Sequence, residues 1–134
     1  MFSVQTLAEL AELVELGEPL YVRYSEGPEA DTAETSIDYE SGCALPGLSV
    51  NPLAPEPWWD RPVEHWVARQ LHQYVHLAAG GRYAWVLTGV VVGRGPDCEP
   101  LIARVQPVAR LADPVIDEAA RLYQEAFDVG SDGA

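Results

Sequence analysis

Four side chains of types that enzymes use for anion binding and charge stabilisation lie on or beside segments that we expect to be strands. Arg23 lies in the middle of an apolar stretch, Ser49 lies in a second one, and Asp97 and Glu99 form an Asp-x-Glu pair ahead of a third. An arginine on a rigid element can bind a phosphate or carboxylate in a bidentate manner. A positioned carboxylate can stabilise positive charge that develops in a transition state.

Each of these residues also has a structural interpretation, and both interpretations stay open at this point. Arg23 can be an edge-strand charge or can pair with one of the many carboxylates. The Ser49 hydroxyl can bond to backbone, and Asp97 and Glu99 can be turn and strand-edge charges. The sequence contains no Gly-rich phosphate loop, nucleophile elbow or Cys/His metal spacing.

The three histidines could be metal ligands. At about 100° per residue, His65, His72 and His76 fall within roughly 40° of one another on a helix, opposite its apolar face. His72 and His76 have the i, i+4 spacing that can chelate a metal ion. No Cys, Asp or Glu accompanies them at ligand spacing, so we expect no metal and interpret them as a solvated or interface-lining stripe.

Residues 45–77 hold the elements that would position much of this chemistry. A short strand over 47–50 should end at Asn51-Pro52, because proline cannot donate to a strand ladder. A Pro-rich turn follows, and Asp60 should cap the longest helix of the chain, which should end at Gly80-Gly81. The spacing predicts that one helix face is buried. Its members are Val63, Trp66, Val67, Leu71, Tyr74, Val75 and Ala78.

The N-terminal part of the chain predicts a helix, a strand and a long loop. The helix should run over 6–16, with Thr6 and Glu9 forming a capping box and Gly17 ending it. The strand covers 19–25 and carries Arg23. We expect the acidic, polar segment 26–42 to be a solvated loop.

The C-terminal part predicts a β-hairpin and a helix. The strand over 82–92 is nearly continuous in β-branched and aromatic residues, so both of its faces should be covered, and Gly89 should mark a bulge. A turn at 93–97 leads to an antiparallel strand over 99–105 that continues extended to residue 111, with Pro107 marking an edge or a bend. Asp113 and Pro114 should start a final helix.

These elements predict an α+β fold: a small mixed or antiparallel sheet, a long central helix and helices at both termini. Residues 1–128 should form a single globular domain, and residues 129–134 a flexible C-terminal tail. The length and composition do not fix an oligomeric state.

The composition limits the environment and the partners. The chain of 134 residues has a net charge of −13, and all eight of its cations are scattered arginines, so we expect no nucleic-acid binding. It has no apolar run of membrane-spanning length and its acidic N-terminus is no signal peptide, so we expect no membrane contact. With two cysteines, Cys43 and Cys98, it is interpreted as a cytoplasmic protein with reduced thiols.

The order Arg23, Ser49 and Asp97-x-Glu99 resembles the Arg–Ser–Glu arrangement of the ADP-ribosyltransferases. The resemblance implies NAD as the substrate. Arg23 would contact the dinucleotide phosphates, Ser49 would order the site, and Glu99 would bind the nicotinamide ribose and stabilise an oxocarbenium-like transition state. Tyr24 or Trp58 would stack on the nicotinamide. The stretches VRYSEGPEAD, LPGLSVNPL, PEPWW and GPDCEPL also resemble a family of small uncharacterised actinobacterial proteins, which implies no activity.

Two classes of function are therefore carried forward. The first is an ADP-ribosyltransferase-like, NAD-binding domain, which predicts that Arg23, Ser49 and Glu99 converge beside Tyr24 or Trp58. The second is a non-catalytic interaction module whose acidic surface and Pro/Trp turn dock a basic protein surface. It predicts that Arg23 is paired with a local carboxylate and that Glu99 is exposed. Trp58 and Trp59 are either one buried and one lid-like ring, or an exposed aromatic platform.

Overall fold

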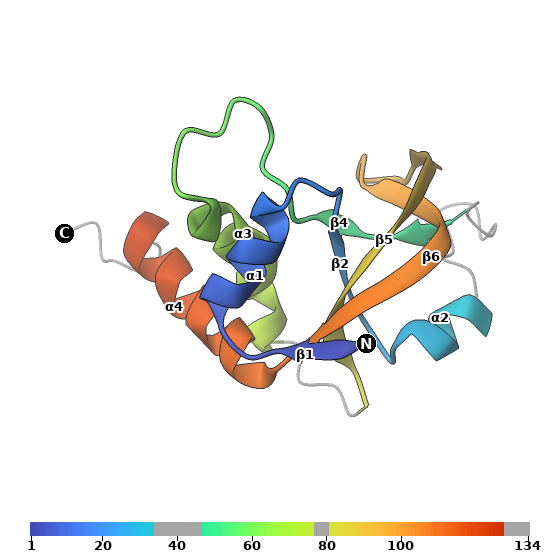
Figure 1. The fold of residues 1–134 in the computed structure, drawn as a ribbon, viewed down its shortest axis with the longest axis horizontal. Coiled ribbons are helices and arrows are strands. Elements are labelled where there is room, and N and C mark those ends of the chain that lie inside the picture. Colours follow the sequence, from blue (N-terminus) through green and yellow to red (C-terminus); the bar gives the residue numbers. More distant parts are fainter. Residues whose placement is uncertain (34–46, 77–80, 128–134) are drawn as a thin grey trace.

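The computed structural model describes residues 1–33, 47–76 and 81–127, and it confirms an α+β fold. A six-stranded mixed sheet curves away from three helices, α1, α3 and α4, that gather on one side of it, while α2 lies at the other side (Figure 1). The strand order is β1-β6-β5-β2-β4, and β3 also pairs with β6. In the described ranges, no helix is long and apolar enough to cross a membrane. The predicted tail, 129–134, lies outside these ranges.

The chain begins with a strand that the sequence did not predict. β1 (Phe2–Val4) runs parallel to the end of β6. The helix α1 (Leu7–Glu15) follows, and the Thr6 hydroxyl accepts the Glu9 N–H at 3.1 Å, which confirms the predicted cap. The buried face of α1 consists of Leu7, Leu10, Ala11 and Val14. The backbone turns at Gly17, which has a φ of +95°.

The predicted loop over 26–42 is wrong at its start. After β2 (Tyr21–Ser25), residues Pro28–Ala33 form the short helix α2. Proline is favoured in the first turn of a helix, and Glu29 and Asp31 place negative charge at its positive end. These local signals outweigh the polarity of the segment. The remainder of the predicted loop falls outside the described residues.

The second predicted strand is split, and it continues beyond its predicted end. β3 (Leu48–Ser49) pairs with β6, and β4 (Asn51–Pro52) pairs with β2, with only Val50 between them. The proline does not stop the strand, because β4 pairs with only one neighbour among the described residues and so needs fewer N–H donors. Since β5 joins β2 to β6, the short segment 48–52 closes the sheet into a ring.

The central helix is shorter than predicted. α3 (Val63–Leu71) has Pro62 at its N-cap position, so the prediction that Asp60 caps this helix is wrong. No side-chain hydrogen bond caps the helix at Pro62. The helix tightens into a 3₁₀ helix, η1 (His72–His76). The longest described helix is instead α4 (Asp113–Phe127). The predicted end at Gly80-Gly81 is only partly within the described residues, since 77–80 lie outside them.

The hairpin of β5 (Tyr83–Arg94) and β6 (Pro100–Leu111) is antiparallel, as predicted. Its register shifts between Thr88 and Val90, which confirms the bulge at Gly89. A Cβ at Gly89 would lie 2.7 Å from the Ala103 carbonyl oxygen, so a larger residue has no room there. The expectation that both faces of β5 are covered is wrong beyond Leu87, where β2 ends and three valines are half exposed: Val90, Val91 and Val92.

Two apolar cores result from this curvature. The larger core lies between the sheet and the helices. As predicted, Val67 and Leu71 of α3 and Tyr74 of η1 are buried in it, whereas Val75 is exposed. The smaller core lies on the other face of the sheet. It is built from Leu48, Val50, Trp85, Leu87 and Ile102.

The phenol of Tyr74 makes stability depend on alkaline pH. Burial raises the pKa of Tyr74 above its ordinary value of 10.0, although the hydrogen bond from Asn51 opposes this effect. Because the folded-state pKa is the higher one, this stabilisation is complete below pH 10.0 and is lost as the pH rises toward the raised value. We expect Tyr74→Phe to flatten the loss of stability above pH 10.0, measured by urea unfolding at stepped pH. Parallel curves for the two proteins would contradict this.

Candidate functional site

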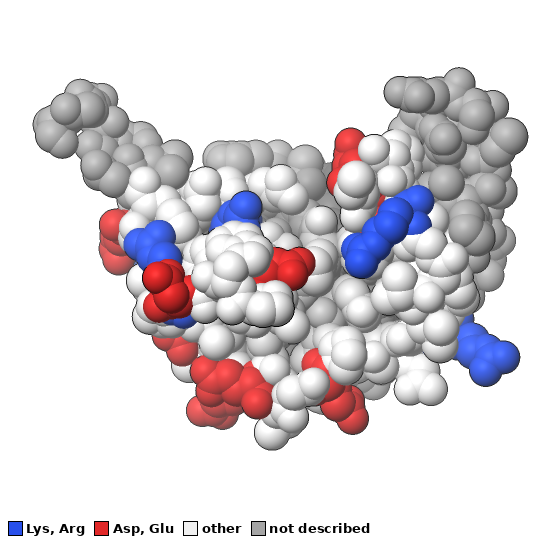
Figure 2. Space-filling view, turned by 90° about the horizontal axis from the view of Figure 1, so that it is seen from above, with Lys and Arg blue, Asp and Glu red and all other residues white. Residues whose placement is uncertain are grey.

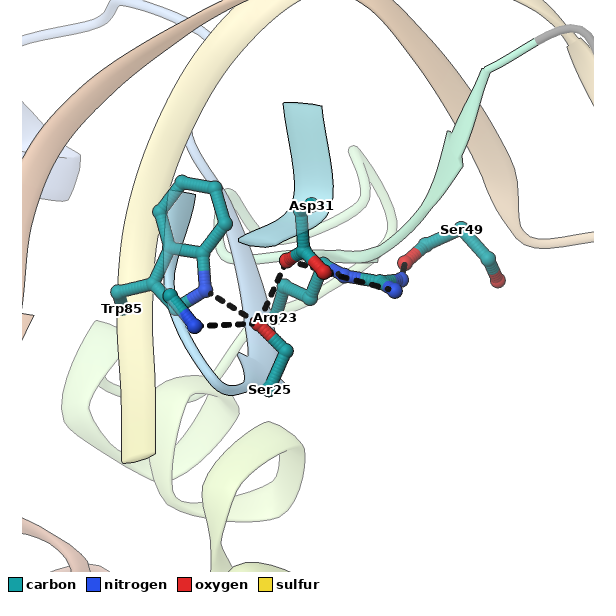
Figure 3. Close-up of polar contacts among 6 residues, drawn as sticks. Arg23, Ser25, Asp31, Ser49 and Trp85 are labelled. Carbon is teal, nitrogen blue, oxygen red and sulfur yellow. Dashed lines mark hydrogen bonds and ion pairs between the residues drawn. The ribbon is translucent and has the colours of Figure 1, made fainter. Parts of the chain in front are cut away.

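Arg23 lies at the centre of a hydrogen-bonded network between β2, α2 and β3 (Figure 3). Its Nε donates to Asp31 Oδ2 at 2.8 Å, its Nη1 donates to the Ser49 carbonyl oxygen at 2.7 Å, and its Nη2 reaches Asp31 Oδ1 at 3.5 Å. All three guanidinium nitrogens are therefore engaged. The pair is largely shielded from water, with 21% and 11% of the two side chains exposed.

Ser25 completes this network from the same face of β2. Its hydroxyl donates to Asp31 Oδ2 at 2.5 Å and accepts from the Gly27 N–H at 3.1 Å and from Trp85 Nε1 at 2.9 Å. The serine is 7% exposed, yet its single donor and both of its lone pairs have partners. A buried polar network of this kind is stabilising only when its members are satisfied, and these are.

The sequence prediction missed Ser25, Asp31 and Trp85 as members of this network. A sequence signal was available for Ser25, because Arg23 and Ser25 are two residues apart in a strand and so share a face. The register that pairs Arg23 with Trp85 is known only from the structure. Asp31 had no such signal, because its position depends on α2, which was predicted to be loop.

Ser49 and Glu99 extend the network toward the end of the hairpin. The Ser49 hydroxyl donates to Glu99 Oε1 at 3.0 Å, and the Asp97 N–H donates to Glu99 Oε2 at 2.9 Å. The partly buried carboxylate thus folds back over its own turn, against Gly95, so the expectation that Glu99 is exposed is wrong. Cys98 in this turn has a φ of 62° and an exposed, free thiol. Arg23, Ser49 and Glu99 form a contiguous line, from guanidinium to backbone carbonyl and from hydroxyl to carboxylate.

The two residues proposed to stack on nicotinamide lie elsewhere. Tyr24 projects from the opposite face of β2 to Arg23 and stacks on Tyr74, with ring centroids 5.3 Å apart. Trp58 lies against Trp59 and Trp66, on the side of the molecule formed by α3. The structure therefore brings together Arg23, Ser49 and Glu99, but places neither ring with them.

A second group of side chains, the aromatic cluster, joins the turn before α3 to α3, η1 and α4. Its members are Trp58, Trp59, His65, Trp66, His72, Tyr123 and Phe127. The ring centroids of His72 and Tyr123 are 3.6 Å apart, and those of His65 and Phe127 are 6.4 Å apart. These two histidines therefore line the interface with α4. Across the described ranges, no group of three or more His, Cys, Asp or Glu could hold a metal ion, and the side chain of His76 lies outside them.

Negative charge is spread over much of the surface. In the view of Figure 2, arginines and acidic side chains are scattered among other residues, and no basic patch forms on this face. On α1 and just after it, Glu9, Glu12, Glu15 and Glu18 are exposed, and Leu16 beside them is 77% exposed. We call these five residues the acidic α1 face. In the part of the chain that the structure describes, Arg23 and Asp31 form the single ion pair.

These observations define an α+β fold in which the polar side chains around Arg23 are hydrogen-bonded to one another. The chain belongs to DUF6098, a family of unknown function, whose model matches residues 1–132. No curated protein and no solved structure matches it.

Proposed function

We propose that this protein is a non-catalytic interaction module that docks a basic surface of another protein. The observation that supports it best is the engagement of Arg23, whose three nitrogens contact Asp31 and the Ser49 carbonyl. To bind a ligand phosphate, Arg23 would have to exchange these hydrogen bonds for new ones. The free-energy cost of breaking a charged pair rises with the burial of the pair. A structural role for Arg23 agrees with the interaction hypothesis, which predicts pairing with a local carboxylate.

The charge distribution supports a cationic partner. The chain carries a net charge of −13, and the acidic α1 face presents four carboxylates with no basic residue in the last turn of the helix. Complementary charge across an interface speeds association and selects the partner. The exposed Leu16 adds an apolar contact to the acidic α1 face.

A matched pair of charge variants tests this proposal. The probe is a fluorescein-labelled octa-arginine peptide, and its affinity is measured by fluorescence polarisation at low and physiological salt. We expect the combined Glu12→Gln, Glu15→Gln and Glu18→Gln variant to bind about tenfold more weakly, because it loses charge at the interface.

The control variant combines Glu56→Gln, Asp117→Asn and Glu125→Gln, which changes the net charge by the same amount at exposed positions elsewhere. We expect it to lose less than about threefold in affinity. Equal losses of peptide affinity in the two variants would show that binding follows net charge alone. This result would overturn the proposal that the acidic α1 face is the binding surface.

A second candidate is the ADP-ribosyltransferase-like site. It is supported by the contiguous line from Arg23 through Ser49 to Glu99, since these are the three residues that the resemblance assigns to dinucleotide binding and catalysis. For this function, Arg23 would exchange Asp31 for the diphosphate, and Glu99 would turn from its own loop to the ribose.

Isothermal titration with millimolar NAD tests this second candidate. The candidate predicts a saturable heat in the wild type that weakens in Glu99→Gln, followed by release of nicotinamide. The control is Asp97→Asn, because only the backbone N–H of Asp97 contacts Glu99. The absence of NAD heat in the wild type would remove this candidate.

A further inference from the structure

The aromatic cluster contains two buried nitrogen atoms that lack hydrogen-bond partners within the described part of the chain. They are Trp66 Nε1 and His65 Nδ1. Trp66 is only 3% exposed, and it belongs to neither apolar core. A buried donor without an acceptor costs about 1–3 kcal/mol, and native proteins keep few of them. The same fold satisfies the Nε1 of Trp85 and of Trp59, so this orphan atom needs its own explanation.

The two unpartnered atoms lie on one continuous set of rings. Trp66 contacts Trp59 with centroids 5.1 Å apart, and Trp59 contacts Phe127 at 6.3 Å. His65 contacts the same Phe127 at 6.4 Å. The cluster therefore offers one N–H donor and one imidazole nitrogen among apolar, flat walls, a combination that is usual in small-molecule sites.

Trp58 is the most exposed ring of the cluster. It is 67% exposed and makes no hydrogen bond with the described residues, whereas Trp59 is held by the Pro62 carbonyl oxygen at 3.2 Å. Its ring lies edge-on to Trp66, with centroids 5.9 Å apart. Rotation of Trp58 would remove one of the rings that pack on Trp66, at the cost of edge-to-face contacts worth about 0.5–1.5 kcal/mol per pair.

Two arginines border the aromatic cluster. The Arg61 guanidinium lies 4.5 Å from the Phe127 ring centroid, and its Nη2 donates to the Ala126 carbonyl oxygen at 2.9 Å. The Arg69 guanidinium lies 5.2 Å from the ring centroid of Trp66. The neighbouring Asp60 and Glu64 are exposed and balance these charges, so the local net charge is near zero while the whole chain carries −13.

We propose that the aromatic cluster binds a small carboxylate with an aromatic or branched apolar body. The apolar body packs against Trp59 and Trp66 in the place that Trp58 vacates. A carboxylate oxygen accepts the Trp66 N–H, and Arg61 and Arg69 flank the charge. The ligand then satisfies a buried donor that the free protein leaves unpaired. This site is separate from the acidic α1 face and does not depend on the function proposed for that face.

Titration by ¹H–¹⁵N correlation spectroscopy tests this proposal, because each of the four tryptophan side chains gives its own indole signal. The probes are phenylacetate, indole-3-acetate and 4-methylpentanoate, each raised to about 10 mM, the affinity range of weak ligands. We expect a saturable downfield shift of the Trp66 indole proton for at least one probe, with the Trp85 signal unchanged. Neutral phenylacetamide is the matched control for the charge and should bind at least about fivefold more weakly, because it lacks the charge-assisted bond.

Two arginine variants localise the effect. Arg69→Gln should weaken binding of the carboxylate about three- to tenfold, whereas Arg104→Gln, an exposed arginine on β6, should not change it. The proposal is overturned if no probe gives a saturable shift, if phenylacetamide binds equally well, or if the Arg104 variant weakens binding as much as the Arg69 variant. The shift of the Trp66 indole signal is measured in the wild-type protein, so the test needs no substitution of this buried ring.

Discussion

Replacing Trp85 with alanine is expected to lower the free energy of unfolding by about 3–5 kcal/mol. Its ring is fully buried in the smaller core, beside Leu87 and Ile102, so truncation leaves a large cavity. The substitution also removes the Nε1 donor from the Ser25 hydroxyl. Urea unfolding at neutral pH, with equal m-values assumed for both proteins, measures the difference.

Trp58→Ala is the matched control, because it removes the same side chain from a position that is 67% exposed. We expect a loss below about 1.5 kcal/mol, set by its edge-to-face contacts with Trp59 and Trp66. Similar losses for the two variants would contradict the existence of the second core.

Replacing Asp31 with alanine is expected to destabilise the protein by about 2–4 kcal/mol. The change leaves the Arg23 guanidinium with only the Ser49 carbonyl and leaves the Ser25 hydroxyl without its acceptor. The partial exposure of both side chains keeps the loss below that of a fully buried pair. Thermal and urea unfolding of the variant give this value directly.

Two other variants bracket the effect of Asp31→Ala. Asp31→Asn keeps an acceptor oxygen but not the charge, so it should recover about half of the lost stability. Asp117→Ala removes an exposed carboxylate that makes no hydrogen bond with the described residues, and should change stability by less than about 0.5 kcal/mol. An Asp31→Ala variant as stable as Asp117→Ala would show that the network does not stabilise the fold.

Much of the fold could be predicted because its signals are local. The N-cap at Thr6, the alternation of β2 and the bulge at Gly89 each depend on neighbouring residues. The failures have non-local causes. β1 is three residues long and is defined by its pairing with β6, and β4 forms because β2 offers it a partner. No local pattern reveals that the segment 48–52 closes the sheet.

The site was predicted in part for the same reason. Arg23, Ser49 and Glu99 do lie along one line of contacts, although they were chosen by residue type and order. Tyr24 and Trp58 do not join them. Strand alternation places Tyr24 on the other face of β2, and Trp58 packs on Trp66 of α3 in the aromatic cluster. The pairing of Arg23 with Asp31 could not be predicted, because Asp31 is positioned by α2, which was predicted to be loop.

The central claim is that Arg23 supports the fold and does not bind a dinucleotide. Thermal melting of the wild type and of Arg23→Ala, each with and without millimolar NAD, tests it most directly. Our account predicts that Arg23→Ala melts several degrees lower and that NAD moves neither curve, because the guanidinium remains bound to Asp31 and Ser49. A rise in the melting temperature of the wild type with NAD, abolished in Arg23→Ala, would contradict this account and establish a dinucleotide site.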